Sequence, residues 1–595
     1  MVDPRIYRVG LVAVVVAVIV FAFSLTPGPA ALPGSVSPGG GFGSAPAQLT
    51  ALARQFPHRA AGSAGDAGLA SWMEQQLRAA TGFNVGESTF AARTGSGTRI
   101  LEAVTATRTG LRPGTIVIVA PRDAVGAPAK AALSGSVVLL DLARALSGQT
   151  LGETVMLVST SGTVGATGTA ALVRSLAGGD VTAAIVLGDL AGARARAPIV
   201  VPWSSNATLA PAVLTTTLGS FVQAQSGLSV DTPTLASQFA HLAVPFSLGG
   251  QTPLVTAGIP AVTLSLSGNR LPAANAEIRP ARMASLGMAV LQTVEALQSG
   301  ASVPAPSLYL TVSGHLVPRW AIRLLALVLI LPVVAVAVDA LARARRRGHG
   351  LLRWVGWVLA GAAPFLLAVL VLVLARLAGI IDAPAGAVGA GAIPIGVRGT
   401  AVLLVTAIAI VAGFWWLRPL CVRYAAGFGG GGARARAAST PAADGAAVAL
   451  IAVLCVLALV LWAVNPLAAV LLVPALHLWM WLSEPRLRAH RGIVNAGIAI
   501  GLLPAILVAA YDAISLGLSP LGLVWSYALY IAGGGASALV DLLWCLVLGS
   551  VASAAVIAVR VATTRPEPAP VATVRGPATY AGPGSLGGTE SALRR

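Results

Sequence analysis

The chain has 595 residues, of which 56% are hydrophobic and 10% are charged, and its formal net charge is +18. This length exceeds what one ordinary core encloses, and this composition excludes a wholly soluble protein. The positive charge is almost all arginine and flanks long apolar runs, which indicates membrane orientation. Because aromatic residues are few and the globular part has no basic stripe, we expect no nucleic-acid partner.

The first apolar run covers residues 9–25 and follows Arg5 and Arg8. It predicts either a cleaved signal peptide, with a weak cleavage site at Pro29-Ala30-Ala31, or a retained anchor. We expect the anchor, within residues 1–25, because the run is longer than a usual signal core. In both cases the chain after it is exported. Residues 26–48, rich in Pro, Gly and Ser, are expected to be a linker.

Residues 49–300 have the composition of a globular domain. Apolar strands alternate in this part with helical patterns, which predicts an α/β domain with a mainly parallel sheet flanked by helices. The expected strands lie near 115–120, 154–159, 183–190 and 260–266, and expected helices lie at 65–80 and 281–298. In such a sheet a ligand site lies beyond the carboxyl ends of the strands. We therefore expect the loop at 121–135 to hold part of any site.

Several segments of this domain occur in a familiar order: Pro57 to Ser63, the helix at 71–77, the pair Ser134-Gly135, and Thr256 to Val262. Together with the strand at 115–120 they resemble the family-28 metallopeptidases, which are di-zinc aminopeptidases. The resemblance covers about residues 50–300. It implies the fold of that family, an α/β domain like a zinc aminopeptidase.

The family's chemistry needs two zinc ions with a bridging carboxylate, and a Glu that takes a proton from the attacking water. By the resemblance, the first ligand His and its orienting Asp fall on Pro121 and Asp123, and the bridging Asp falls on Ala131. The Glu pair falls on Gly162 and Thr163. The next ligand acid falls on Asp189 and the final His on Gln251. One ligand of five therefore remains, and the base is absent. The resemblance thus implies a degenerate site with no catalytic residue, no metal and no cofactor.

Two acids remain at these positions, Asp123 and Asp189. We expect both to bond loop backbone; the alternative is that they line a metal-free cleft for a peptide or a lipid-linked ligand. The exported part contains His58, His241 and His315, none at ligand spacing from another, and no cysteine, so replacement zinc ligands are not expected. We expect His241 to be a surface or loop histidine.

Nucleophilic catalysis has little support in this domain. Ser134 and Ser161 are expected in tight turns and lie outside a G-x-S-x-G elbow. Lys130, the only lysine of the chain, precedes Ser134 by four residues. A Ser-Lys pair is an alternative to a solvated loop lysine. The cysteines Cys421, Cys455 and Cys545 all follow the domain, so we expect no disulfide in it.

After a linker at 301–318, residues 319–562 predict a bundle of about seven membrane helices. The expected spans are 320–341, 354–375, 399–417, 445–464, 467–483, 493–510 and 536–559. With the first anchor they make eight spans and a disordered cytoplasmic tail at 563–595. The run at 521–533 is a ninth span or a re-entrant piece, and a ninth span would contradict the charge rule.

Basic residues alternate between the spans as the positive-inside rule requires if residues 26–318 are outside. They are Arg343, Arg345, Arg346, Arg347 and Arg353; Arg418, Arg423, Arg434 and Arg436; and Arg486, Arg488 and Arg491. Three polar groups, Arg376, His477 and Asp541, lie near or inside apolar runs. We expect the first and last at helix ends and His477 bonded to a neighbouring helix, with no pair at the spacing of a proton relay.

The sequence therefore predicts a multi-pass plasma-membrane protein whose degenerate aminopeptidase-like domain binds or scaffolds at the outer face. Its architecture resembles that of the attachment subunit of the GPI transamidase, which is a non-catalytic relative of the family. The expected partners are the lipid bilayer, proteins of a membrane complex, and a peptide or lipid-linked ligand. Two alternatives stay open: an active membrane-bound zinc aminopeptidase, and a transporter or lipid-handling permease with an accessory ectodomain.

Overall fold

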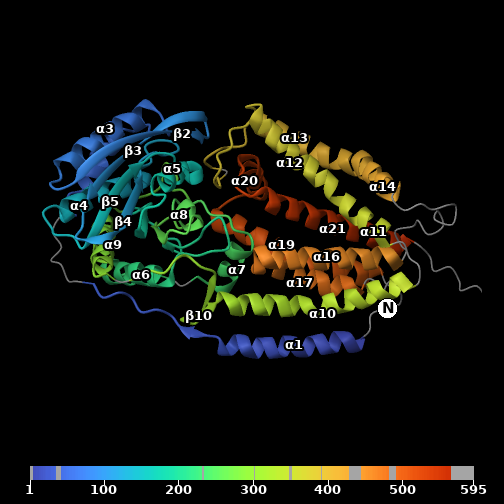
Figure 1. The fold of residues 1–595 in the computed structure, drawn as a ribbon. Coiled ribbons are helices and arrows are strands. Elements are labelled where there is room, and N and C mark those ends of the chain that lie inside the picture. The colour runs from blue at the N-terminus through green and yellow to red at the C-terminus, as the bar shows by residue number, and fades with distance from the viewer. Residues whose placement is uncertain are drawn as a thin grey trace, which may run out of the picture.

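The protein is described by a computed structural model that covers residues 4–34, 42–230, 233–300, 302–346, 351–389, 391–427, 444–481 and 491–563. It consists of a mixed α/β domain followed by a helical region (Figure 1). Several expected features lie outside the described residues, namely the tail after Thr563 and the loop residues Arg347, Arg434, Arg436, Arg486 and Arg488.

A seven-stranded sheet forms the centre of the α/β domain, in the order β2-β3-β5-β4-β6-β8-β7. The strands are β2 (Asn84–Thr94), β3 (Gly97–Arg108), β4 (Arg112–Pro121), β5 (Glu153–Thr160), β6 (Val181–Leu187), β7 (Val200–Val201) and β8 (Ala261–Leu264). Strand β4 pairs in parallel with β5 and β6, and β6 pairs in parallel with β8. Strands β2, β3 and β7 join antiparallel at the margins. The expected parallel sheet is therefore the centre of a mixed one.

The hairpin of β2 and β3 was not expected from the sequence. Its strands carry exposed polar residues along most of β2, so they lack the apolar runs by which the central strands were recognised. Antiparallel strands of this kind are solvated on one face and contribute few core residues. The central strand β4, in contrast, is buried from Ile116 to Ala120.

Helices cover the sheet, and their bounds are α2 (Ala45–Gln55), α3 (Ala64–Ala79), α4 (Lys130–Leu146), α5 (Thr167–Ser175), α6 (Ala212–Ser226), α7 (Leu235–Ala243), α8 (Thr252–Thr256) and α9 (Arg282–Gln298). Helix α4 is buried along most of its length and packs on β4 and α9. It begins at Lys130, so the loop expected at 121–135 is shorter and ends at Ala129. The apolar residues of α4 continue into the core and favour the earlier helix start.

The two expected linkers carry structure, which corrects that part of the prediction. Strand β1 (Thr26–Pro27) pairs with β10 (His315–Pro318), and β10 pairs with β9 (Tyr309–Val312). Helix α2 begins at Ala45, which is fully buried in the domain core. The small sheet joins the end of α1 (Pro4–Phe23) to the start of α10 (Arg319–Arg346), because β1 follows the first and β10 precedes the second.

The helical region contains α11 (Leu351–Leu359), α12 (Ala363–Leu377), α13 (Val397–Ala412), α14 (Arg418–Gly427), α16 (Asp444–Val464), α17 (Pro466–Met480), α19 (Arg491–Leu516), α20 (Pro520–Gly533) and α21 (Ala538–Thr563). Within the described residues, six helical stretches are long and apolar enough to cross a membrane. The expected spans at 9–25 and 467–483 correspond to the shorter apolar helices α1 and α17. Both pack against α10.

Helix α20 lies at the junction between the bundle and the α/β domain (Figure 1). Its Trp525 donates a hydrogen bond to the carbonyl oxygen of Ile393, at 2.9 Å, in the loop between α12 and α13. Phe246 of the α/β domain packs against Tyr527 and Tyr530 of α20. Helix α20 connects the domain-facing ends of α19 and α21, and with 14 residues it is one of the shorter apolar helices.

The polar groups of the bundle lie where the sequence indicated. Arg376 is in the last turn of α12 and Asp541 is in the first turn of α21. His477 of α17 shares a hydrogen bond of 2.7 Å with the hydroxyl of Tyr7 on α1 and lies 2.9 Å from the carbonyl oxygen of Leu329 on α10. This histidine therefore links three helices of the bundle.

Candidate functional site

A small cavity of about 60 Å³ lies at the carboxyl ends of β4, β5, β6 and β8. Five of the seven positions that the family resemblance singled out line it: Pro121, Asp123, Gly162, Thr163 and Asp189. The remaining two, Ala131 and Gln251, are neighbours in sequence of lining residues. The fold thus brings together positions that are far apart in the chain, as expected for loops that follow parallel strands.

Asp123 is buried in the loop after β4 and is bonded to the loop after β5. Its Oδ1 accepts hydrogen bonds from the backbone N–H groups of Gly162 and Thr163, both at 3.0 Å, and from the Thr163 hydroxyl at 2.6 Å. Its Oδ2 lies 3.1 Å from the Thr163 nitrogen. The carboxylate therefore closes one site loop onto the other, as expected for an acid that bonds loop backbone.

Asp189, in the loop after β6, also accepts hydrogen bonds from loop residues. Its Oδ1 accepts from the backbone N–H groups of Ala191, at 3.0 Å, and Gly192, at 2.8 Å. Its Oδ2 accepts from the hydroxyl of Ser267 at 2.6 Å. Both oxygens are thus engaged by protein donors, and Asp189 is buried.

Gln251 stands where the resemblance places the final ligand histidine, and it is fully buried. Its Nε2 donates to the carbonyl oxygen of Trp203 at 2.8 Å, and its Oε1 accepts from the Thr263 hydroxyl at 2.5 Å. The amide therefore ties the start of α8 to β8 and to the segment around Trp203. Such a fully bonded amide is a structural element of the cleft wall.

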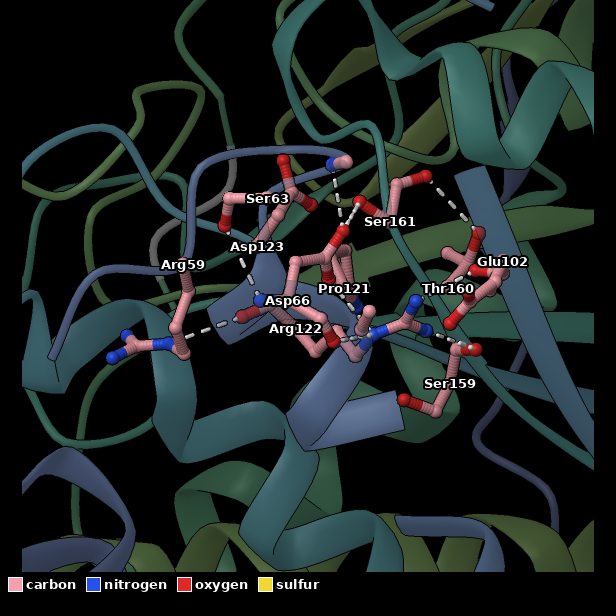
Figure 2. Close-up of polar contacts among 12 residues, drawn as sticks. Arg59, Ser63, Asp66, Glu102, Pro121, Arg122, Asp123, Ser159, Thr160 and Ser161 are labelled. Atoms are coloured by element: carbon pink, nitrogen blue, oxygen red, sulfur yellow. Dashed lines mark hydrogen bonds and ion pairs between the residues drawn. The ribbon is translucent and has the colours of Figure 1, made fainter. Parts of the chain in front are cut away.

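Two buried arginines support the floor of the cleft (Figure 2). Arg122 is fully buried, and its Nε lies 2.9 Å from Asp66 Oδ1. The Nε–H is directed toward the Asp66 carbonyl oxygen at 3.3 Å, while the other two nitrogens donate to the carbonyl oxygens of Ser159 and Glu102. Asp66 in turn accepts from Ser161 at 2.5 Å and from the backbone N–H of Gly62 at 2.9 Å.

Arg59 holds the loop that follows β4. Its Nε donates to the carbonyl oxygen of Arg122 at 3.3 Å, and its terminal nitrogens donate to the carbonyl oxygens of Phe56, Pro128 and Ala129. The loop from Arg122 to Ala129 is therefore held from beneath by one guanidinium. Charge-assisted bonds to carbonyl oxygens satisfy a buried guanidinium in the absence of a direct carboxylate partner.

Burial sets the protonation of the site acids. It raises the pKa of Asp123 from 3.8 to about 6, helped by the nearby Asp66 carboxylate, while the bonds from Thr163 and the charge of Arg122 oppose the rise. Burial also raises the pKa of Asp189, against the bond from Ser267. Asp123 is therefore mainly ionised at pH 7 and takes up a proton in mildly acidic solution.

The cleft does not fit the two zinc ions that the chemistry of the family-28 metallopeptidases needs. Zinc in such sites takes three or four His, Cys, Asp or Glu ligands. Pro121, Ala131 and Gly162 have no donor side chain, and the oxygens of Asp123 and Asp189 already accept bonds from protein donors. Within the described residues no group of three or more His, Cys, Asp or Glu side chains could hold a metal ion.

Nucleophilic alternatives do not fit either. Ser134 is fully buried, donates to the carbonyl oxygen of Ala131 at 2.6 Å and accepts from the Leu190 N–H at 2.8 Å. Its hydroxyl is therefore committed to structure and has no bond with Lys130, which begins α4. Ser161 donates to Asp66 and is also fully buried.

The histidines lie away from the cleft. His241 is in α7, 5% exposed and stacked on Trp203 with ring centroids 4.4 Å apart, so the expected surface or loop position is wrong. Burial lowers its pKa to about 4, and it is therefore neutral at pH 7. His58 and His315 are exposed.

Sequence reasoning missed the supporting charges Arg59, Asp66 and Arg122. A signal was present, because Arg122 and Asp123 directly follow an apolar strand and a charged pair there must be compensated when buried. It also missed Arg270, which lines the cavity and donates to the carbonyl oxygens of Ile514 and Ser515 in α19. Nothing in the local sequence around Arg270 indicates this contact across 244 residues or more.

A second cavity, of about 380 Å³, lies apart from these positions. Its walls come from α6, from Trp203 and Gln238, and from the small sheet that joins α1 to α10. None of the seven site positions is among its described lining residues. The larger of these two cavities is therefore not the one at the positions that the family resemblance singled out.

No family model matches the chain, and no curated protein matches it. Among solved structures, glutaminyl cyclase from Fimbriiglobus ruber is similar at 16% identity and a TM-score of 0.33, over 45% of this chain and 99% of that chain. The LapA aminopeptidase from Legionella pneumophila is similar at 16% identity and a TM-score of 0.35, over 43% and 72% of the two chains. The zinc aminopeptidase BSAP from Bacillus subtilis is similar at 10% identity and a TM-score of 0.35, over 44% and 95%. These likenesses concern the fold alone.

Proposed function

We propose that this chain is a plasma-membrane protein whose α/β domain is a metal-free binding or scaffold module at the outer face. The observation that carries the proposal is the state of the two site carboxylates. Both accept hydrogen bonds from loop residues on both oxygens, and Pro121, Ala131 and Gly162 have no side chain that could bind a metal ion. A cleft built in this way keeps its shape without a metal ion.

The arrangement of charge supports an external position for the domain. Helix α1 begins next to Arg5 and ends next to β1, so its basic end points away from the α/β domain. The basic last turn of α10, with Arg343, Arg345 and Arg346, is likewise the end far from β10. By the positive-inside rule the far end is cytoplasmic and residues 26–318 are extracytoplasmic. Eight crossings then bring the tail to the cytoplasm.

The architecture supports a scaffold role by analogy alone. A short amino-terminal helix, a degenerate aminopeptidase-like domain and a membrane bundle also make up the attachment subunit of the GPI transamidase, which the chain resembles in this respect. By this analogy the ligand of the cleft is a peptide or a lipid-linked group, and the bundle contacts proteins of a membrane complex. The basic cytoplasmic loops bind anionic lipid head groups.

The test is metal content and turnover of the full-length chain in lipid nanodiscs after zinc loading. Aminopeptidase and glutaminyl cyclase substrates are both used, since the similar solved structures carry those two names. We expect no stoichiometric zinc and no turnover. A variant with Pro121→His and Gln251→His restores two donors but not the bridging acid at Ala131, and we expect it to stay without tight zinc binding.

Two zinc ions per chain together with turnover in the unmodified protein would overturn the proposal. A zinc aminopeptidase assayed in the same nanodisc preparation controls for loading and for substrate access. If zinc and turnover are absent, chemical crosslinking of the full-length chain in its native membrane then identifies the proteins or lipid-linked groups next to the cleft.

A further inference from the structure

Near the domain-facing end of α19, the carboxylate of Asp512 is buried, and no side chain in the described residues forms an ion pair with it. The residue is 1% exposed. Its Oδ2 accepts a hydrogen bond of 2.9 Å from the hydroxyl of Tyr527 on α20. Its Oδ1 is buried and has no hydrogen-bond partner in the described part of the chain. An ionised carboxylate in such a place costs several kcal/mol unless a positive partner compensates it.

The elements packed on α19 are α7, α17, α20 and α21. Their described side chains include the following titratable groups: His241 on α7, His477 on α17, Tyr527 and Tyr530 on α20, and Asp541 and Cys545 on α21. His241 is neutral at pH 7, and the ring nitrogens of His477 are engaged by the Tyr7 hydroxyl and the Leu329 carbonyl oxygen, not by Asp512. Arg270 contacts this end of α19, but it directs its guanidinium to the carbonyl oxygens of Ile514 and Ser515.

Two chains of contacts lead from this end of α19 to the cleft. In the first, Tyr527 packs on Phe246 with ring centroids 4.9 Å apart. Phe246 is buried in one cluster with Leu248, which lines the cleft, and with Leu516 of α19. A movement of Tyr527 away from Asp512 therefore disturbs the packing of a cleft residue.

The second chain of contacts runs through Arg270, which lines the cleft and bonds the last turn of α19. Its neighbour Asn269 accepts bonds from the Ser247 hydroxyl at 3.0 Å and from the Leu248 N–H at 3.1 Å. Both routes thus end at one short segment, residues 247–250, which forms the cleft rim.

We propose that Asp512 is a proton-binding site of the membrane bundle, and that its protonation controls how tightly the cleft rim at 247–250 packs on α19 and α20. The protonated acid fits the apolar junction. Loss of the proton to water leaves an unpaired charge, and this charge is relieved only when water enters between Tyr527 and Phe246. A proton is the fitting cation, because a metal ion needs more oxygen ligands than Asp512 and Tyr527 supply.

Infrared spectroscopy of the full-length chain in nanodiscs tests whether Asp512 holds a proton. At neutral pH we expect the band of a protonated carboxyl group to decrease in the Asp512→Asn variant. The matched control is Asp339→Asn, since Asp339 is a bundle carboxylate that pairs with Arg343 on the same helix. It should leave the band unchanged. An unchanged band in Asp512→Asn, or an equal loss in the control, would overturn the assignment.

Hydrogen exchange of the backbone amides of residues 246–250 tests the link to the cleft rim. After correction for intrinsic rates, we expect protection in the unmodified chain to fall with rising pH, by at most about tenfold per pH unit for one linked proton, and to level off once Asp512 is ionised in the packed state as well. The Asp512→Asn variant should stay protected throughout, and Asp339→Asn should follow the unmodified chain. Protection that does not change between about pH 5 and pH 9, or that changes equally in Asp512→Asn, contradicts the proposal.

Two further experiments test whether Asp512 is the group that titrates and whether the bound cation is a proton. Tyr527→Phe removes a donor that favours the ionised acid, so the midpoint should move to higher pH; a midpoint that stays in place counts against the site. Replacing sodium by a large organic cation at constant pH should leave protection unchanged, and a change would mean a sodium site instead. None of these measurements needs a ligand in the cleft, so their outcome does not depend on the proposed binding role of the domain.

Discussion

Below the cleft, Arg59, Asp66 and Arg122 are almost completely buried, and each is held by several hydrogen bonds or an ion pair. At the junction with the membrane bundle, Asp512 is equally buried, but among the described residues its carboxylate has one hydrogen bond and no positive partner. The first arrangement is expensive to break, because removing one member leaves the others buried and unpaired. The second is relieved by a proton. The extent of burial alone therefore does not determine whether a buried group stays ionised. Its hydrogen-bond and ion-pair partners determine it.

The largest effect is expected from Arg122→Met, which removes the buried ion pair between Arg122 and Asp66. It leaves Asp66 without its cation and frees the carbonyl oxygens of Glu102 and Ser159, so we expect a loss of about 3–5 kcal/mol in the free energy of unfolding. The melting temperature of the full chain measures it. Arg78→Met is the control, because the Arg78–Glu74 pair is on the surface and is worth well under about 1 kcal/mol. Equal effects of the two substitutions would contradict the role of Arg122.

The next effect concerns the pH dependence that Asp123 confers. Because its pKa is raised from 3.8 to about 6, the folded chain keeps a proton that the unfolded chain has lost. Stability should therefore fall as the pH rises from about 4 to about 6, by up to roughly 3 kcal/mol, and then level off.

Asp123→Asn should remove this contribution, since its amide oxygen still accepts the bonds from Gly162 and Thr163. Melting temperatures of both proteins across this pH range test it, with the exposed Asp180→Asn as the control. A variant with the same pH profile as the unmodified chain would show that Asp123 is not the group responsible.

A smaller effect is expected at a neutral polar contact of the same junction. Asn465 caps α17 by accepting from the N–H groups of Leu467 and Ala468, and its amide donates to the carbonyl oxygen of Leu242 in the α/β domain. Asn465→Ala should cost about 1–2 kcal/mol. Asn465→Asp keeps the cap but loses the donor, so it separates the two contributions in the same melting experiment. No loss in either variant would mean that the junction does not depend on this residue.

The smallest effect on stability is expected at Asp512. Asn is close in shape to a protonated Asp, so Asp512→Asn should change the melting temperature at neutral pH by little, within about 0.5 kcal/mol. Asp66→Asn, in contrast, removes a charge that Arg122 needs and should destabilise the chain by several times more. Equal losses of stability in Asp512→Asn and Asp66→Asn would contradict the distinction between the paired charges below the cleft and the unpaired acid at the junction.

Part of the cleft was predictable because short-range rules govern it. Asp123 and Asp189 follow apolar strands, and the carboxyl ends of parallel strands meet at one edge of a sheet, so their loops had to be close. That Pro121, Ala131 and Gly162 have no side chain able to bind a metal ion follows from the residue types themselves. The apolar runs of the bundle likewise predict membrane helices by length and composition alone.

Other features depended on contacts that no local pattern records. The antiparallel strands β2 and β3 are half solvated, so their residues carry no clear apolar signal. The segments at 26–48 and 301–318 look like linkers, yet they pair with each other across the chain, because β1 and β10 become neighbours only when α1 and α10 lie side by side.

The sequence by itself determined the α/β class, the apolar helices and the residue types at the cleft, because composition and periodicity express how each segment avoids or meets water. The tertiary structure decided how buried charges are compensated, since a partner such as Asp66 for Arg122 is brought into contact by folding and not by proximity in the chain. It also placed Tyr527, Arg270 and the end of α19 next to the cleft rim. Hydrogen bonds and ion pairs are short-ranged, so only the packed fold shows which buried acid has found its partner.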